Sequence, residues 1–231
     1  MRVPTLPPLL DGARCPPGGE LLDRAADGAA SGEHEAGAFL HRISDDRIAC
    51  ALVLEPEVER ERAAQMLPLV QVATGEALSV LAPPDTRVEY LWAGEIALNG
   101  AACGGVRGRM ADNDGDVPDW LALEVRLRRT AAGEPGHDMA RTSLMDELGP
   151  SIDAIELVES MARHLVLWLH RWGDEGFAPL ARKWSKQVAG TGERFETEEI
   201  SGTLLGVDDE GAALVRMADR TLAVPLTRVW R

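Results

Sequence analysis

Lysine is almost absent from this chain. Of 231 residues, 24 are lysine or arginine, and Lys183 and Lys186 are the only lysines. Chemistry that needs a lysine side chain therefore has just two candidates, both late in the chain. Positive charge at a binding site must come mainly from arginine, whose planar guanidinium suits carboxylates and phosphates.

Cysteine and long apolar runs are also scarce. The three cysteines (Cys15, Cys50, Cys103) are an odd number at long spacings, which excludes a disulfide framework and a paired-cysteine zinc site. We therefore expect a reducing, cytoplasmic location. Residues 1–19 are rich in proline and lack the apolar segment of a signal peptide. No stretch approaches the roughly 18 apolar residues of a membrane span.

The charge balance is strongly acidic. Aspartate and glutamate number 38, which gives a net charge of −14 and argues against nucleic acid or an anionic membrane as partner. The 45% hydrophobic content is that of a globular protein, and the length suits one sizeable domain with a small appendage.

The apolar spacing predicts an α+β chain. We expect an irregular arm over residues 1–18 and a break near Pro68 in the second helix, and Ser151 as the N-cap of the third. The predicted helices cover 19–30, 57–81, 151–172 and 174–187. The predicted strands cover 38–43, 47–56, 88–92, 95–98, 103–110, 120–129, 202–207, 213–217 and 221–226. The last three suggest a small barrel-like appendage.

Metal-binding patterns are weak. The run 112–116 (DNDGD) resembles a calcium loop, but Val117 and Leu123 stand where that loop needs glycine and glutamate. His164 and His170 lie six residues apart and do not share a helix face, while His34 and His137 fall in predicted loops. We predict no metal site.

Arginines and glycines gather on two neighbouring strands. A strand over 103–109 would place Cys103, Gly105, Arg107 and Arg109 on one face. The strand 120–129 carries Arg126 and Arg128 on its polar face. Together they could form a cationic surface for a carboxylate or phosphate. The alternative is a solvated face on which arginines pair with residues such as Glu124. Cys103, as a lone thiol, is more typical of a small buried residue than of a nucleophile.

The stretch 90–109 (YLWAGEIALNGAACGGVRGR) resembles the central motif of the biotin/lipoate protein ligase family. Its run begins at Leu91 and Trp92, continues to an Asn99-Gly100 turn and ends on a glycine, Gly105. Later matches are a short TSL signature at 142–144, Trp184 and a glycine-rich tail over 202–215. The resemblance spans roughly residues 37–231.

The resemblance implies a mixed, largely antiparallel sheet flanked by helices, as in class II synthetases and biotin ligases. It implies a ligase-like domain over 1–188 and an SH3-like domain over 189–231. The implied chemistry uses ATP and Mg to activate biotin or lipoate as an acyl-adenylate, which a carrier-protein lysine then captures. The implied ligand-binding residues are Trp92, Gly94, Glu95, Asn99, Gly104, Gly105, Arg107 and Arg109.

Two departures from the family pattern leave the activity open. The family lysine aligns with Ala102, and the span of the Gly/Arg-rich loop is the short, glycine-free 42–50. One reading is a divergent acyl-ligase in which arginine replaces the missing charge. A second is a non-catalytic member that binds an acyl ligand or a partner protein. A third is an unrelated α+β domain.

Overall fold

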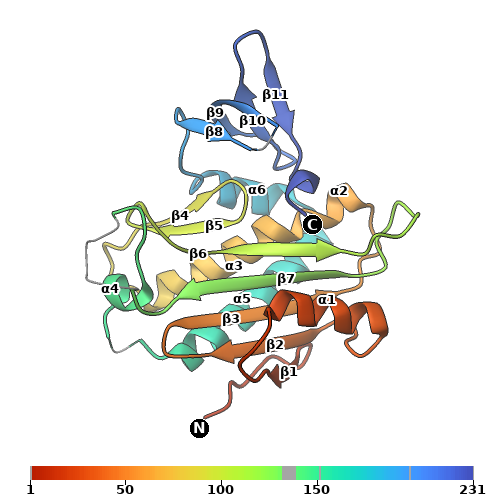
Figure 1. Ribbon diagram of the computed structural model, residues 1–231, viewed down its shortest axis with the longest axis vertical. Helices are drawn as coiled ribbons and strands as arrows, with labels where there is room; N and C mark the ends of the chain where they lie inside the picture. The colour runs from red at the N-terminus through yellow and green to blue at the C-terminus, as the bar shows by residue number, and fades with distance from the viewer. Residues whose placement is uncertain (1, 132–138, 151, 198, 231) are drawn as a thin grey trace.

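A seven-stranded mixed sheet forms the body of the protein in this computed structural model (Figure 1). The structure describes residues 2–131, 139–150, 152–197 and 199–230. The strand order is β1-β2-β3-β7-β6-β5-β4, and only the β1–β2 pair is parallel. The strands are β1 (Asp11–Arg14), β2 (Ala38–Ile43), β3 (Arg47–Leu54), β4 (Val88–Leu91), β5 (Glu95–Leu98), β6 (Ala101–Met110) and β7 (Leu121–Arg128).

Helices cover both faces of this sheet. One face carries α1 (Leu21–Ser31), and we call it the front face. The other face packs on α3 (Met66–Leu81), α5 (Ala154–Glu175) and α6 (Ala178–Ser185), which enclose the main core. Two short helices, α2 (Arg60–Ala63) and α4 (Leu144–Leu148), complete the set in this part of the chain. Figure 1 shows α1 before the sheet and α3 and α5 behind it.

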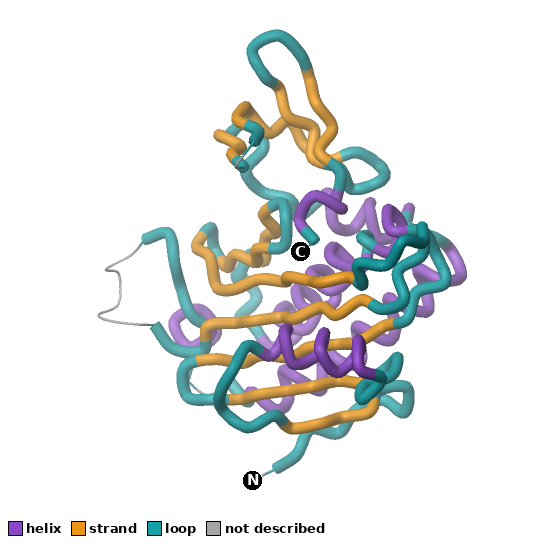
Figure 2. Tube along the Cα trace, turned by 45° about the vertical axis from the view of Figure 1, so that its right-hand side comes forward, coloured by secondary structure: helices purple, strands orange, loops and turns teal. Residues whose placement is uncertain are grey.

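A second sheet of four antiparallel strands sits above the first (Figure 2). Its strands are β8 (Arg194–Glu196), β9 (Ser201–Val207), β10 (Ala213–Arg216) and β11 (Thr221–Val224), followed by the 3₁₀ helix η1 (Leu226–Val229). The arrangement is consistent with an SH3-like domain. The expected fold class, a mixed sheet flanked by helices with a small C-terminal β unit, is confirmed.

Three local predictions need correction. The arm over 1–18 is not wholly irregular, because its residues 11–14 form β1, a fully exposed strand that backbone pairing with β2 holds in place. The break near Pro68 lies earlier, at residues 64–65. Pro68 itself sits in the first turn of α3, where no backbone N–H is needed. The N-cap of α5 is Asp153, whose carboxylate accepts from Ile155 N at 2.8 Å; Ser151 lies outside the described residues.

No helix within the described residues is long and apolar enough to cross a membrane. The three cysteines are all buried and free.

Candidate functional site

The front face of the central strands carries the charged cluster that the arginine spacing predicts. The register of the β6–β7 pair places Arg107 of β6 opposite Glu124 of β7. Arg107 Nε donates to Glu124 Oε2 at 2.8 Å, and Arg126 Nη2 donates to Glu124 Oε1 at 3.1 Å. The Glu124 side chain is fully buried. Its two bonds to guanidinium groups therefore offset the free-energy cost of removing a charged carboxylate from water.

A second carboxylate, that of Glu20, completes the cluster. It lies just before α1 and accepts hydrogen bonds from both Arg107 and Arg126. Those two bonds lower the pKa of Glu20 to about 2. Glu20 and Glu124 thus share the Nη2 atoms of the two arginines. Of the two alternatives for this face, the one in which arginines form ion pairs with glutamates is correct for Arg107 and Arg126.

A tight turn joins β2 to β3 at the edge of this cluster. Ser44 Oγ donates to Asp46 Oδ1 at 2.6 Å, and Ser44 N donates to Arg47 O at 2.9 Å. The whole connection is residues 44–46, between Ile43 and Arg47. A long loop that could fold over a ligand is therefore missing here.

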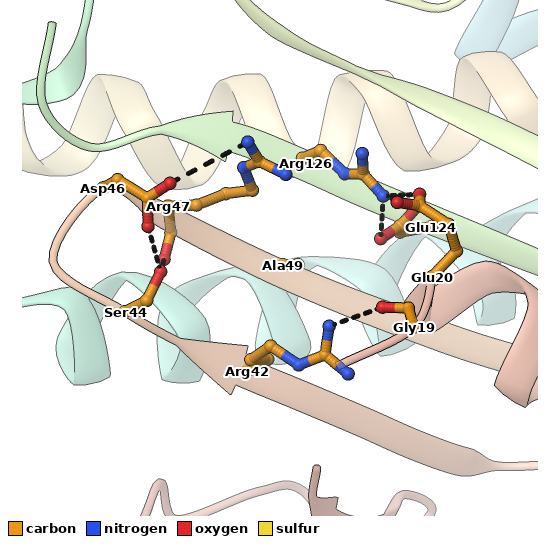
Figure 3. Close-up of a pocket in the computed structure, with 9 residues that line it drawn as sticks. All are labelled: Gly19, Glu20, Arg42, Ser44, Asp46, Arg47, Ala49, Glu124 and Arg126. Atoms are coloured by element: carbon orange, nitrogen blue, oxygen red, sulfur yellow. Dashed lines mark hydrogen bonds and ion pairs between the residues drawn. The ribbon is translucent and has the colours of Figure 1, made fainter. Parts of the chain in front are cut away.

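A small polar pocket of about 140 Å³ lies between this turn and the charged cluster (Figure 3). Arg42 forms its lower wall and donates to the carbonyl oxygens of Gly18 and Gly19 at 2.9 and 3.0 Å. Arg47 lies across from it, 3.8 Å from Asp46 and about half exposed. The pocket is lined by Gly19, Glu20, Arg42, Ser44, Asp46, Arg47, Ala49, Glu124 and Arg126.

A second pocket of about 250 Å³ shares Asp46, Arg47 and Arg126 with the first. Its far wall includes Gly104 and Arg128. Arg128 Nη1 donates to the carbonyl oxygens of Ala102 and Thr142, at 3.0 and 2.7 Å. The two pockets together make a polar, arginine-rich depression along β3, β7 and β6, which we call the front pocket.

The residues predicted from the central motif are spread over several environments. Trp92 points to the second sheet, where its Nε1 donates to Gly211 O at 3.1 Å. Asn99 sits in the hairpin turn with φ of 52° and donates to Glu147 Oε2 at 2.6 Å. Glu95 is exposed and pairs with Gly105 across β5 and β6. Arg109 donates to Asp23 of α1 at 3.2 Å.

The glycines of the motif allow close packing of backbones. A Cβ at Gly94 would lie 2.2 Å from Val106 O, and one at Gly104 would lie 2.0 Å from Arg126 O. At Gly105 the nearest atom is Gly94 O, at 2.9 Å. Since all three contacts are with neighbouring backbone, the glycines are explained by the strands themselves.

Cys103 does not share the arginine face. The pairing of β5 with β6 shifts by one residue at this point, and Cys103 turns into the main core. Burial raises the pKa of its thiol to about 12, which suits an inert buried residue. Ala102 lies beside it, with its carbonyl engaged by Arg128 and by Thr142 N.

Several residues of the front pocket were not predicted from the sequence, among them Glu20 and Arg42. Glu20 lies in a segment without a recognisable motif, and Arg42 is the first residue of the short span 42–50 that stands in place of the Gly/Arg-rich loop. The approach of both residues to β7 depends on tertiary packing. The only signal for Glu20 was its position after Gly18-Gly19 and before a helix, which is typical of a cap and not of a site.

Comparisons with known proteins agree with one another. The model of the biotin/lipoate A/B protein ligase family matches residues 6–186. A curated relative is a biotin–[acetyl-CoA-carboxylase] ligase of Paracoccus denitrificans, 28% identical over 192 residues that cover 79% of each chain. A biotin protein ligase-like protein of unknown function from Silicibacter sp. TM1040 is 35% identical, covers 99% of this chain and 100% of its own, and has a TM-score of 0.91.

More distant structures share the fold. A variant biotin protein ligase from Aquifex aeolicus, in complex with biotin, has a TM-score of 0.74 at 16% identity and covers 94% of this chain and 96% of its own. The family match covers most of the chain, and the 35% identity extends over nearly all of it, so this chain belongs to the biotin/lipoate A/B protein ligase family.

Proposed function

We propose that this chain binds a small carboxylic acid of the biotin or lipoate kind in the front pocket, and that it has diverged from adenylate chemistry. The observation that supports this is the cluster in which Glu20 and Glu124 pair with Arg107 and Arg126. Glu20 and Glu124 already engage Arg107 and the Nη2 atom of Arg126. Arg47, the rest of the Arg126 guanidinium and the outer part of Arg128 line the front pocket and can receive a single ligand carboxylate.

The residues present do not fit ATP and Mg. A triphosphate needs several uncommitted cations and a cover that excludes water. The β2–β3 connection is the short turn 44–46, and the family lysine position is Ala102. We therefore derive no step through a nucleotide.

The predicted ligand-binding residues have different roles in this proposal. Gly104 forms part of the pocket wall, and Arg107 holds the inner carboxylates in place. Gly94 and Gly105 let β5 and β6 approach closely beneath it. Trp92, Glu95 and Asn99 contact neighbouring elements outside the front pocket. Arg109 lies outside it too, on a separate cavity of about 1010 Å³ that Arg107 also lines. The cytoplasmic location and the division at residue 188 stay predictions.

Isothermal titration calorimetry with biotin, lipoate and ATP tests the proposal. We expect an acid to bind and ATP to give no heat. Glu20→Gln removes the competing carboxylate and should tighten acid binding several-fold, whereas Arg126→Gln should weaken it. Arg24→Gln, an exposed arginine of α1 outside the pocket, is the matched control and should change nothing. Equal affinity in Glu20→Gln, Arg126→Gln and the parent chain would overturn the proposed site.

A second candidate is a divergent ligase that transfers the acid to a carrier-protein lysine. The resemblance to the Paracoccus denitrificans biotin–[acetyl-CoA-carboxylase] ligase favours it. An assay of pyrophosphate release, with ATP, an acid and a biotin or lipoyl carrier domain, measures this ligase activity directly. Release by the parent chain would establish the ligase and exclude the non-catalytic proposal. Release only after Ala102→Lys would show that the scaffold is intact and that the reaction was lost with the lysine.

A further inference from the structure

A separate cavity lies on the opposite face of the sheet, below its β1–β2 edge. Side chains alternate along β2, so Phe39 enters the main core while Leu40 packs beneath α1. By the same alternation His41 and Arg42 point to opposite faces. Arg42 lines the front pocket, and His41 lines a cavity of about 290 Å³. We call it the rear cavity.

Three parts of the chain enclose the rear cavity. They are the N-terminal arm, the ends of β1 and β2 with the residue after β7, and the start of α5. Figure 1 shows the arm at the foot of the sheet beside β1 and β2. The lining residues are Arg2, Val3, Pro4, Arg14, His41, Ile43, Arg129, Ile152, Asp153, Ala154 and Ile155.

Two polar groups on this lining are buried without a partner. His41 is only 4% exposed, and its Nδ1 has no hydrogen-bond partner among the described residues. Arg129 Nη1 donates to Ser44 O at 3.1 Å and lies 3.7 Å from Asp45, but its Nε is buried and lacks a partner in the same part of the structure. Buried polar atoms of native proteins are nearly always satisfied by protein or by ordered water, so these two atoms on one cavity are available to a polar partner, either water or a ligand group.

The arginines around the rear cavity favour an anionic ligand. Arg2, Arg14 and Arg129 line the cavity together with one carboxylate, Asp153. Just outside the lining, Glu159 lies 3.7 Å from Arg2 and Asp45 lies 3.7 Å from Arg129, so Arg14 carries the charge that is left for an anion. The Asp153 carboxylate is already used, because it accepts from Arg2 Nη1 at 3.0 Å and from Ile155 N at 2.8 Å. Arg14 has no ion pair within the described residues. Burial and the nearby Arg14 lower the pKa of His41, so the imidazole is neutral at neutral pH and adds a hydrogen bond without charge.

The rest of the lining is apolar. Val3, Pro4, Ile43, Ile152 and Ile155 contribute aliphatic surface beside the charged end. A fully hydrated anion such as phosphate would leave that surface uncovered, whereas an acid with a short hydrocarbon chain would cover it. We propose that the rear cavity is a second binding site, which takes the carboxylate of a small aliphatic acid between Arg14, Arg129 and His41.

Titration of the full chain with acetate, butyrate, hexanoate and inorganic phosphate tests this site. We expect affinity to rise by roughly three- to four-fold for each methylene that is buried, with no saturable binding of phosphate. Arg14→Gln should lower the affinity for hexanoate at least ten-fold. Arg14 is exposed on β1, so the variant should fold normally, and an unchanged thermal unfolding midpoint without ligand checks this.

Two controls separate the rear cavity from the front pocket. Arg24→Gln should leave hexanoate binding unchanged, and Arg126→Gln should weaken only binding at the front pocket. In NMR spectra of the imidazole nitrogens, hexanoate should shift the His41 signals in the parent chain and not in Arg14→Gln. Binding that survives Arg14→Gln, signals of His41 that do not move, or equal binding of phosphate would each overturn the proposal. None of these outcomes depends on whether the front pocket binds biotin or lipoate.

Discussion

At the scale of single residues, the most consequential group is the buried Glu124 carboxylate. It lies on a β-strand face where Ala122 packs beneath α1, and its bonds to Arg107 and Arg126 offset the loss of water. The cluster therefore serves stability as well as any ligand. Two predictions belong to it.

Replacing Glu124 by glutamine should destabilise the protein. Arg107 and Arg126 would keep Glu20 and partial access to water, so we expect a loss of about 2 kcal/mol, less than for a fully buried pair. Urea unfolding measures it. The control is Glu199→Gln, which removes an exposed ion pair with Arg228 and should cost less than about 1 kcal/mol. Equal losses in both variants would contradict a structural role for Glu124.

The pKa of Glu20 predicts a pH dependence in the acid range. A carboxylate whose pKa falls from 4.5 to about 2 on folding stabilises the folded state fully above pH 4.5. That contribution is lost as the pH falls from 4.5 towards 2, because the unfolded state takes up the proton first. Glu20→Gln should therefore flatten the decline in the free energy of unfolding over this interval. Parallel curves for the two proteins would rule out the Arg107 and Arg126 bonds as the cause.

At the scale of elements, the contact between α3 and β4 depends on a glycine. Gly75 lies in the buried middle of α3, and a Cβ there would come within 2.1 Å of the Tyr90 hydroxyl. The close approach explains why a residue with poor helix propensity stands inside a helix.

Substitution of Gly75 by alanine should reverse the usual gain in helix stability. We expect a loss of about 1–3 kcal/mol from overpacking against Tyr90, measured by thermal or urea unfolding. Gly173→Ala in α5 is the matched control, because nothing lies within 4 Å of its added Cβ, and it should gain about 0.5–1 kcal/mol. Tyr90→Phe combined with Gly75→Ala should recover part of the loss. A stabilising Gly75→Ala would show that β4 can move away at no cost.

At the scale of the whole molecule, Trp92 links the two sheets. Its ring lies 5.4 Å from that of Phe195, and its Nε1 donates to Gly211 O. Trp230, after η1, covers Gly108 of β6, where a Cβ would come within 2.4 Å of the indole. The small C-terminal sheet has a modest core of its own, so these contacts contribute to its order.

Replacing Trp92 by alanine should loosen the C-terminal sheet. We expect limited proteolysis to cut more rapidly within residues 189–231, while hydrogen exchange of β3 and β7 stays slow. Trp120→Ala, at the edge of the α1 cluster, is the control and should leave the C-terminal sheet protected. Equal cleavage in both variants would show that Trp92 does not hold the two sheets together.

Local pattern was sufficient to predict most elements. The spacing of three and four in α5, the alternation in β7 and the Asn99-Gly100 turn each follow from side-chain period or turn chemistry, and each was found. The exposed strand β1 was not predictable, because its side chains carry no pattern and only pairing with β2 defines it.

The sequence by itself determined that positive charge comes mainly from arginine, that position 102 is alanine and not lysine, and that the β2–β3 connection is short. These depend only on which residues are present and in what order. The tertiary structure alone decided how the charges are used. It brings Glu20, distant in the chain, onto Arg107 and Arg126, turns Cys103 into the core and leaves His41 buried beside Arg14. The physical reason is that a charge is tolerated according to its neighbours and its access to water, and both are set by packing between segments far apart in the chain.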